Sequence, residues 1–368
     1  MLTIKRLTEP TLIIDEQKAR SNINRMAEIA AKNSLNFRPH FKTHQSAVIG
    51  EWYKKAGVSG ITVSSLRMAE YFARHGWNNI TVAIPVNTLE AGLINKLASS
   101  VSLNLLVDST IVVERLQNQL DCDCSLFIKI DTGYHRAGIP SHETERIREL
   151  ILKIKGGEHT SFAGFLWHDG HTYHTRSKEE ILTIRNQSVK LIAPLRQLAV
   201  DLDCDAIFSA GDTPSCSIAS NYSGIDEIRP GNFIYYDLMQ HQLGSCTFDQ
   251  IAAAVFCPVL SVYPERNQIL IHGGAVHFSK ENLTGFKEYP VYGAVVLPNP
   301  DCTWNEPVKD AFLTGLSQEH GLITAPIEFV NTLKPGDMLG IVPVHSCLTV
   351  SCMQKFITTG GQQCTILQ

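Results

Sequence analysis

One βα unit decides the fold: residues 102–136 read SLNLLVDSTIVVERLQNQLDCDCSLFIKIDTGYHR. A short apolar run (102–107) is followed by an amphipathic stretch, and a second apolar run (125–130) then leads into a polar loop. The same alternation extends from residue 35 to about residue 230, which is typical of parallel strands joined by helices. This part of the chain therefore predicts an α/β fold.

Eight candidate strands can be counted in this region. They are residues 36–40, 60–64, 79–84, 102–107, 125–130, 162–168, 206–210 and 225–229. Eight strands favour a closed (β/α)₈ TIM-type barrel over an open sheet, because closure leaves no edge strand to protect. Ser177 and Glu180 have the spacing of a capping box and predict the start of a helix after the sixth strand.

The pattern changes after about residue 243, where short β-branched and apolar runs alternate with turn signals and helical periodicity fades. We therefore predict two domains, a barrel over residues 8–243 and a C-terminal, mainly antiparallel β domain over residues 244–368. The apolar run Thr11–Ile14 would be a ninth strand. We expect this N-terminal stretch, within residues 1–14, to pair with the second domain.

Acidic and basic residues nearly balance, since 32 Lys and Arg against 36 Asp and Glu give a net charge of −4. No long basic run is present, which argues against a nucleic-acid partner. The longest stretch without charged residues, 338–354, contains Pro343 and is too short to span a membrane. The N-terminus lacks the apolar segment of a signal peptide, and the cysteines show no disulfide framework. We therefore expect a cytoplasmic protein.

Polar side chains follow the predicted strands, where barrel enzymes carry their active sites. Lys42 comes directly after the first strand; near the barrel axis its amine would be partly desolvated, which lowers the pKa and suits it for a Schiff base. An exposed loop lysine is the alternative. The usual phosphate-binding loops of such barrels offer Gly211, Thr213, Gly231 and Asn232 here, although ordinary turn residues would look the same.

His345 and Cys347 stand two residues apart, so on a strand both side chains would point to one face. Imidazole and thiolate suit Zn²⁺, and two protein ligands leave open positions, as in a catalytic site. The other interpretation is a buried cysteine beside a hydrogen-bonded histidine. His168, His171 and His174 form a rival candidate metal site, but such spacing needs a helix for the rings to converge and this stretch is predicted to be a loop.

Five motifs stand in order along the chain: Arg38-Pro39-His40-Phe41-Lys42-Thr43-His44, Asp131-Thr132-Gly133 with Arg136, Gly211-Asp212-Thr213-Pro214-Ser215, Pro230-Gly231-Asn232 and His345-Ser346-Cys347. Together they resemble the D-serine dehydratase and D-threonine aldolase family. That family is built on the alanine-racemase-type fold, a barrel plus a β domain, and binds pyridoxal 5'-phosphate (PLP) and a divalent metal. The similarity covers essentially the whole chain.

The resemblance assigns roles to the residues that match the family's motifs. It implies that Lys42 binds PLP through its amine and that Arg136 contacts the oxygen on the PLP ring. It also implies phosphate contacts from Thr213, Gly231 and Asn232, with Tyr173 nearby.

For the metal, the resemblance implies that His345 and Cys347 hold zinc or another divalent cation. Zinc and PLP together would serve either dehydration of a D-β-hydroxy amino acid to a 2-oxo acid and ammonia, or retro-aldol cleavage to glycine and an aldehyde. We favour dehydration, because the soft His-x-Cys pair resembles the dehydratase branch. The chain departs from that branch at Leu166-Trp167, where a dehydratase-like site would place a tyrosine. The family also implies a homodimer acting on a small D-amino acid.

Three other functions fit parts of the pattern. A PLP-carrier protein would share the barrel but lack the β-rich region after residue 243. A metal-dependent hydrolase would use His168, His171 and His174 and leave Lys42 without a role. An amino-acid racemase would need a second base opposite the lysine and no metal.

Overall fold

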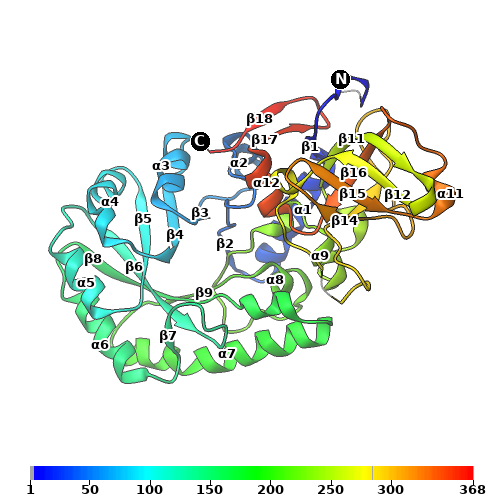
Figure 1. Cartoon of the computed structure of the whole chain (residues 1–368). Helices are drawn as coiled ribbons and strands as arrows, with labels where there is room; N and C mark the ends of the chain where they lie inside the picture. The colour runs from blue at the N-terminus through cyan, green and yellow to red at the C-terminus, as the bar shows by residue number, and fades with distance from the viewer. Residues whose placement is uncertain (1–3, 284, 368) are drawn as a thin grey trace. The chain divides into compact units, whose positions relative to one another are not determined.

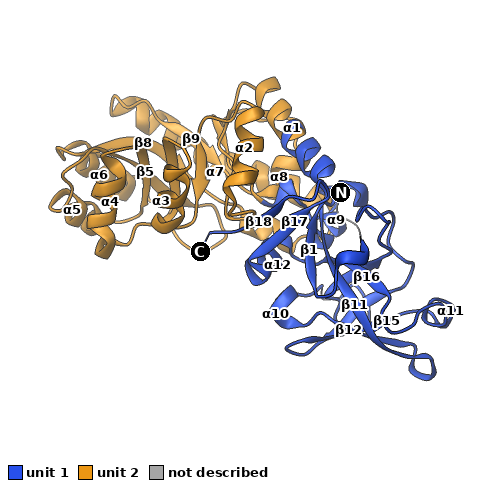
Figure 2. Cartoon of the chain, turned by 90° about the horizontal axis from the view of Figure 1, so that it is seen from above, with its two compact units in different colours: residues 1–24, 232–368 blue, residues 25–231 orange. Residues whose placement is uncertain are grey.

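A computed structural model describes residues 4–283 and 285–367 of the chain. It divides into two compact units, one formed by residues 25–231 and the other by the segments before and after them (Figure 2). We refer to them as the barrel unit and the β unit. Helix α1 (Glu16–Lys32) runs through the division at residue 24.

The barrel unit is built on eight parallel strands, which confirms the predicted fold class (Figure 1). They are β2 (Asn36–Phe37), β3 (Ile61–Val63), β4 (Asn79–Pro85), β5 (Ser102–Val107), β6 (Cys124–Asp131), β8 (Thr160–Leu166), β9 (Ile207–Ala210) and β10 (Glu227–Ile228). They pair in the order β2-β10-β9-β8-β6-β5-β4-β3. A parallel bridge between His40 and Thr62 joins the two ends of this path, since Phe41 N–H donates to Thr62 O (2.8 Å).

Helices connect these strands as the alternating pattern predicted. They are α2 (Ala47–Lys55), α3 (Leu66–Arg74), α4 (Ala91–Ala98), α5 (Thr110–Gln117), α6 (Thr144–Lys155), α7 (Lys178–Asp201) and α8 (Thr213–Ile218). Ser177 caps α7 by accepting a hydrogen bond from Glu180 N–H (3.2 Å), as the capping-box spacing predicted. A short strand, β7 (Ile139–Pro140), pairs with β6 after the polar loop.

The β unit contains a closed ring of antiparallel strands. The ring is formed by β11 (Ala253–Tyr263), β12 (Gln268–His272), β15 (His320–Thr324), β14 (Phe312–Leu316), β13 (Gly293–Val296) and β16 (Met338–Pro343). β1 (Thr11–Ile14) pairs with β11 and with β17 (Lys355–Thr358), which in turn pairs with β18 (Gln363–Thr365). The short helices are α9 (Leu238–Gln242), α10 (Ala275–Phe278), α11 (Ile327–Val330) and α12 (Ser346–Met353).

The division between the units differs from the expected boundary at residues 243 and 244. Residues 232–243 group with the β unit, where Met239 N–H donates to Val344 O (3.2 Å). Residues 232–243 form only short helical segments, so their sequence shows no strand or helix periodicity. The sequence pattern therefore could not reveal that they belong to the β unit. Throughout the described ranges, no helix has both the length and the apolar character needed to cross a bilayer.

Candidate active site

Lys42 lies in the turn that follows β2 and the closing bridge of the barrel. Its backbone N–H donates to Nδ1 of His40 (3.3 Å), and the neighbouring Phe41 is fully buried against Tyr53, Phe72 and Trp77. These aromatic contacts fix the turn at the carboxyl end of the strand. The Lys42 side chain itself is exposed, unlike the partly desolvated amine expected from the sequence, because its buried neighbours take the inward positions.

Several cationic groups lie around two buried histidines at this end of the barrel. Burial is the main cause that holds the pKa of His40 well below its ordinary value, and the charges of Lys42, Arg229 and Arg136 lower it further. Burial is also the main cause that lowers the pKa of His168. The hydrogen bond to Gly211 O raises this pKa, and the charges of Lys42 and Arg136 lower it. Both histidines are therefore neutral among positive charges, and an anion complements such a site.

Two of these cations, Arg229 and Lys129, were not predicted from the sequence. Arg229 is buried at the end of β10 and donates to Trp167 O and to Ser209 Oγ, both at 2.6 Å, while burial lowers its pKa to about 10. Lys129 lies inside β6, donates to Ile130 O (3.0 Å), and has its pKa lowered to about 7, mainly by burial. The only sequence signal for Lys129 was a charged residue inside an apolar strand run, and Arg229 was marked only by its place at the end of a strand.

The loop after β9 carries the predicted phosphate contacts. Asp212 caps α8 by accepting from Ser215 N–H (2.7 Å), and Tyr173 OH accepts from Thr213 N–H (3.2 Å). Thr213 Oγ1 is buried and has no hydrogen-bond partner within the described chain. A buried hydroxyl without a partner is costly unless a ligand completes it. This orphaned hydroxyl fits the oxygens of a phosphate group.

Gly211 and Gly231, the two predicted glycines, allow neighbouring groups to approach the backbone closely at the same strand ends. A Cβ added to Gly211 would lie 3.0 Å from the guanidinium carbon of Arg229, and one added to Gly231 would lie 3.0 Å from His40 O. Both positions are buried. Any side chain there would displace the groups that form the cationic site.

A buried acid pair, also missed from sequence, underlies these loops. Asp169 Oδ1 accepts from Thr132 Oγ1 (2.7 Å) and Ser188 Oγ (2.6 Å), and burial raises its pKa. Burial and the neighbouring Asp169 raise the pKa of Asp212 to about 6. Asp169 thereby ties the loop after β6, which carries Arg136 over the Tyr134 ring (5.2 Å), to the segment after β8.

The rival histidine cluster does not form a metal site in the described residues. His168 Nδ1 is hydrogen-bonded to Gly211 O, His171 stacks on Tyr134, and His174 is exposed. The three side chains do not offer ligand atoms to one point. His168 lies before the short 3-10 helix Gly170–His174 and is held by Gly211, so the helix does not bring the three rings together.

In the β unit, His345 and Cys347 lie at the start of α12 and not on a strand as expected from their spacing. His345 is the residue before the helix, and its side chain is hydrogen-bonded to Cys347. Asp237, which was not predicted, lies with Oδ2 3.3 Å from Nδ1 of His345. Burial lowers the pKa of His345, but Cys347 and Asp237 together hold it well above its ordinary value.

Asn232, expected among the phosphate contacts, has its side chain beside this pair. Its Nδ2 donates to Asp237 Oδ2 (2.6 Å) and Ser346 Oγ (3.2 Å) and lies 3.6 Å from Cys347 Sγ. A histidine whose second ring nitrogen faces a carboxylate, next to a thiol, is the arrangement of a metal ligand pair with its supporting groups. The donor set fits zinc.

The sequence can now be placed among known proteins. Residues 14–238 match the family model described as "Alanine racemase, N-terminal domain", which is more than half of the chain, and residues 252–359 match "Putative serine dehydratase domain". The chain belongs to the alanine racemase N-terminal domain family. Its relatives also confirm the expected D-serine dehydratase and D-threonine aldolase family, so it is an enzyme, a PLP-dependent lyase.

Members of the family resemble the chain over most of its length. D-serine dehydratase from Dictyostelium discoideum is 29% identical, covering 96% of this chain and 93% of its own. D-threonine aldolase from Arthrobacter sp. is 22% identical over 64% of this chain and 62% of its own. The structure of D-threo-3-hydroxyaspartate dehydratase from Delftia sp. HT23 superposes with a TM-score of 0.92 at 24% identity, covering 100% and 99% of the two chains. A cysteine variant of that dehydratase has been solved in a metal-free form.

Proposed function

We propose that this family member is a PLP- and zinc-dependent lyase that dehydrates a D-β-hydroxy amino acid to a 2-oxo acid and ammonia. The observation that carries the proposal is the His345–Cys347 pair at the start of α12, supported by Asp237. A metal-independent enzyme of the same fold would have no use for this set of donors. The names of the D-serine and D-threo-3-hydroxyaspartate dehydratases support the same reaction.

The residues that we assign to PLP come from the barrel unit, apart from Asn232, which directly follows it in the sequence. We assign Lys42 to hold the cofactor through its amine and Arg136 to contact the ring oxygen. The phosphate would be bound by Gly211, Thr213, Gly231 and Asn232, with Tyr173 beside them. The unpartnered hydroxyl of Thr213 and the cations around His40 are the support for this assignment.

Each protein group has a definite task in this reaction. PLP supplies an electron sink that makes the substrate Cα–H acidic. The amine of Lys42 would be the base that accepts this proton. Arg229 and Arg136 hold the surrounding field positive, which favours binding of the anionic groups of cofactor and substrate.

In the β unit, the side chains prepare a metal ligand pair. Zinc at this pair supplies a Lewis acid for the substrate hydroxyl. Asp237 accepts from the imidazole and fixes its orientation, so that Nε2 is the nitrogen left for a metal. Asn232 donates to the same carboxylate and lies against the Cys347 sulfur, which fixes the thiol in turn.

The alternative outcome is cleavage to glycine and an aldehyde, as the name of the D-threonine aldolase suggests. Either reaction would use a metal held by His345 and Cys347 as a Lewis acid, and the two differ in whether the substrate hydroxyl leaves or loses its proton. We favour dehydration, because the two dehydratases match 96% and 94% of this chain whereas the aldolase matches 64% of it. We also expect a homodimer located in the cytoplasm.

The experiment is product analysis of purified protein with D-serine, D-threonine and D-threo-3-hydroxyaspartate. Equal amounts of 2-oxo acid and ammonia from at least one substrate support dehydration. Glycine with an aldehyde would replace the proposal with the aldolase reaction. Interconversion of D- and L-serine without either product would identify a racemase instead.

A further inference from the structure

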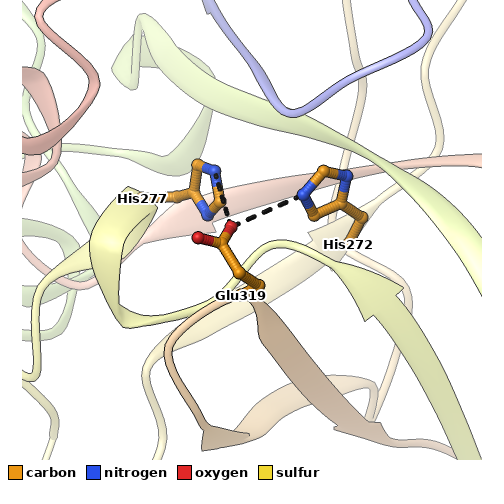
Figure 3. A group of neighbouring side chains, drawn as sticks. All are labelled: His272, His277 and Glu319. Carbon is orange, nitrogen blue, oxygen red and sulfur yellow. Dashed lines mark ion pairs between the residues drawn. The ribbon is translucent and has the colours of Figure 1, made fainter.

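Three side chains of the β unit that the proposed function does not use gather at one place. His272 ends β12, His277 lies in α10, and Glu319 lies in the turn between β14 and β15. Figure 3 shows the Glu319 carboxylate pointing between the two imidazole rings. Its Oε2 lies 3.6 Å from Nε2 of His272 and 3.9 Å from Nε2 of His277. Each residue offers a ligand atom within 4.8 Å of those of the other two.

The backbone holds these three side chains in place. Three hydrogen bonds tie the start of α10 to the β14–β15 turn: Gly273 N–H to Glu319 O (2.9 Å), Ala275 N–H to Ser317 O (2.7 Å) and Val276 N–H to Gln318 O (3.3 Å). In the sheet, His272 pairs directly with His320, the residue after Glu319. Main-chain structure therefore brings the three residues to one place.

We propose that His272, His277 and Glu319 bind a divalent transition-metal ion such as Zn²⁺ at a second site, distinct from His345 and Cys347. Two imidazoles and one carboxylate are a zinc donor set that leaves a fourth position for water. Metal–ligand distances near 2.1 Å at tetrahedral angles place ligand atoms about 3.4 Å apart. The two carboxylate–imidazole separations of 3.6 and 3.9 Å lie close to this value, and all three ligand atoms lie within 4.8 Å of one another.

One hydrogen bond of His277 opposes metal binding and should lower the affinity of the site. Nδ1 of His277 accepts from Gly274 N–H (3.1 Å), so the neutral ring carries its proton on Nε2, facing Glu319. Coordination through Nε2 moves that proton to Nδ1 and ends this hydrogen bond. Because metal-binding histidines usually donate this second N–H to an acceptor, the site should be weaker than one supported in that way.

An ion at this site would brace the helix that carries Cys347. α10 lies against α12, where Thr349 Oγ1 donates to Phe278 O (3.4 Å). His277 and Phe278 are adjacent in α10. Holding His277 on a metal therefore restrains the carbonyl that Thr349 uses, and we infer a structural role for the ion. This inference does not depend on the proposed function.

The test measures zinc bound per full-length chain after equilibration with a zinc buffer. We expect Glu319→Gln and His277→Ala each to bind about one ion fewer than the natural sequence, which means about one against about two where His345 and Cys347 also bind zinc. His320→Ala, a neighbouring histidine outside the cluster, should bind as many ions as the natural sequence. Glu319→Gln retains the size of an exposed side chain, so a failure to fold does not confuse the result.

Cobalt substitution separates this site from His345 and Cys347. The thiolate-to-cobalt absorption band should persist in Glu319→Gln and disappear in Cys347→Ala. Zinc content unchanged by Glu319→Gln and His277→Ala, or reduced equally by His320→Ala, would overturn the second site. Neither result depends on turnover, so a failed lyase assay leaves this test intact.

Discussion

The carboxylate of Asp237 lies 3.3 Å from Nδ1 of His345, so the histidine of the candidate metal pair is oriented by an acid from another helix. The same oxygen accepts from Ser346 N–H at 3.0 Å, which fixes the first turn of α12. Asp237 also caps α9 through Gln240 N–H (2.9 Å). The residue therefore joins the metal pair to the local backbone.

Asp237→Asn should lower zinc affinity by about 10- to 100-fold, because the neutral amide orients the imidazole less strongly. The melting temperature should fall as well, because both Asp237 oxygens accept hydrogen bonds from buried donors and the amide nitrogen of asparagine cannot accept. Competition with a chromophoric chelator measures the affinity. Asp249→Asn, an exposed carboxylate of the same unit, is the matched control. Equal zinc affinity in both variants would remove Asp237 from the metal site.

Borohydride reduction should attach PLP irreversibly to Lys42, and peptide mapping would locate it. Lys129 is the informative competitor, because its pKa of about 7 makes it a good nucleophile near neutral pH. We expect Lys42→Ala to lose the label and the visible absorbance together, and Lys129→Met to keep both. A label on Lys129 would transfer the cofactor role to that residue.

Thr213→Val should weaken PLP binding by about tenfold or more, since a hydrogen bond to a charged group contributes about 1.5–3 kcal/mol. The apoprotein should not lose stability, because the hydroxyl it removes is buried without a partner. Thr172→Val provides the opposite case: that hydroxyl donates to Asp169 O at 2.7 Å, so its loss should destabilise the fold. Spectroscopic titration with PLP and urea unfolding measure the two effects. A Thr213→Val apoprotein destabilised as much as Thr172→Val would argue against a phosphate role.

Lys129 should make stability depend on pH in the alkaline range. Its pKa is about 7 when folded and 10.5 by reference when unfolded, so the unfolded chain binds the extra proton between these values. The free energy of unfolding should therefore rise with pH across this window, by about 1.4 kcal/mol per pH unit. Between about pH 7.5 and pH 9, the free energy of unfolding measured with urea should rise by about 2 kcal/mol more in the natural sequence than in Lys129→Met. Lys190→Met, at an exposed position, should keep the natural slope. If the free energy of unfolding depended on pH equally in Lys129→Met and Lys190→Met, Lys129 would remain protonated in the folded protein across this range.

The fold followed from apolar runs, which is why β5 begins and ends where the sequence predicted it. The site was harder, because its groups meet through tertiary contacts. Asp237 precedes His345 by 108 residues, and no local spacing connects them. Lys129 and Arg229 each lie beside apolar strand residues, so only the structure shows that they are buried. Asn232 was expected from loop chemistry, yet its side chain is directed by Asp237.

The most direct test of the account is the rate of 2-oxo acid formation from D-serine before chelation, after chelation and after zinc is restored. The account predicts that chelation abolishes formation of 2-oxo acid and ammonia, since the metal at His345 and Cys347 acts on the substrate and two protein ligands are too few for a closed structural zinc site. The PLP absorbance and a cooperative melting transition should remain, with the melting temperature lowered only by the loss of the second ion. Zinc should then restore turnover, except in Cys347→Ala and His345→Ala. Undiminished 2-oxo acid formation by the chelated enzyme, with its zinc shown to be gone, would contradict the catalytic role of the His345–Cys347 metal.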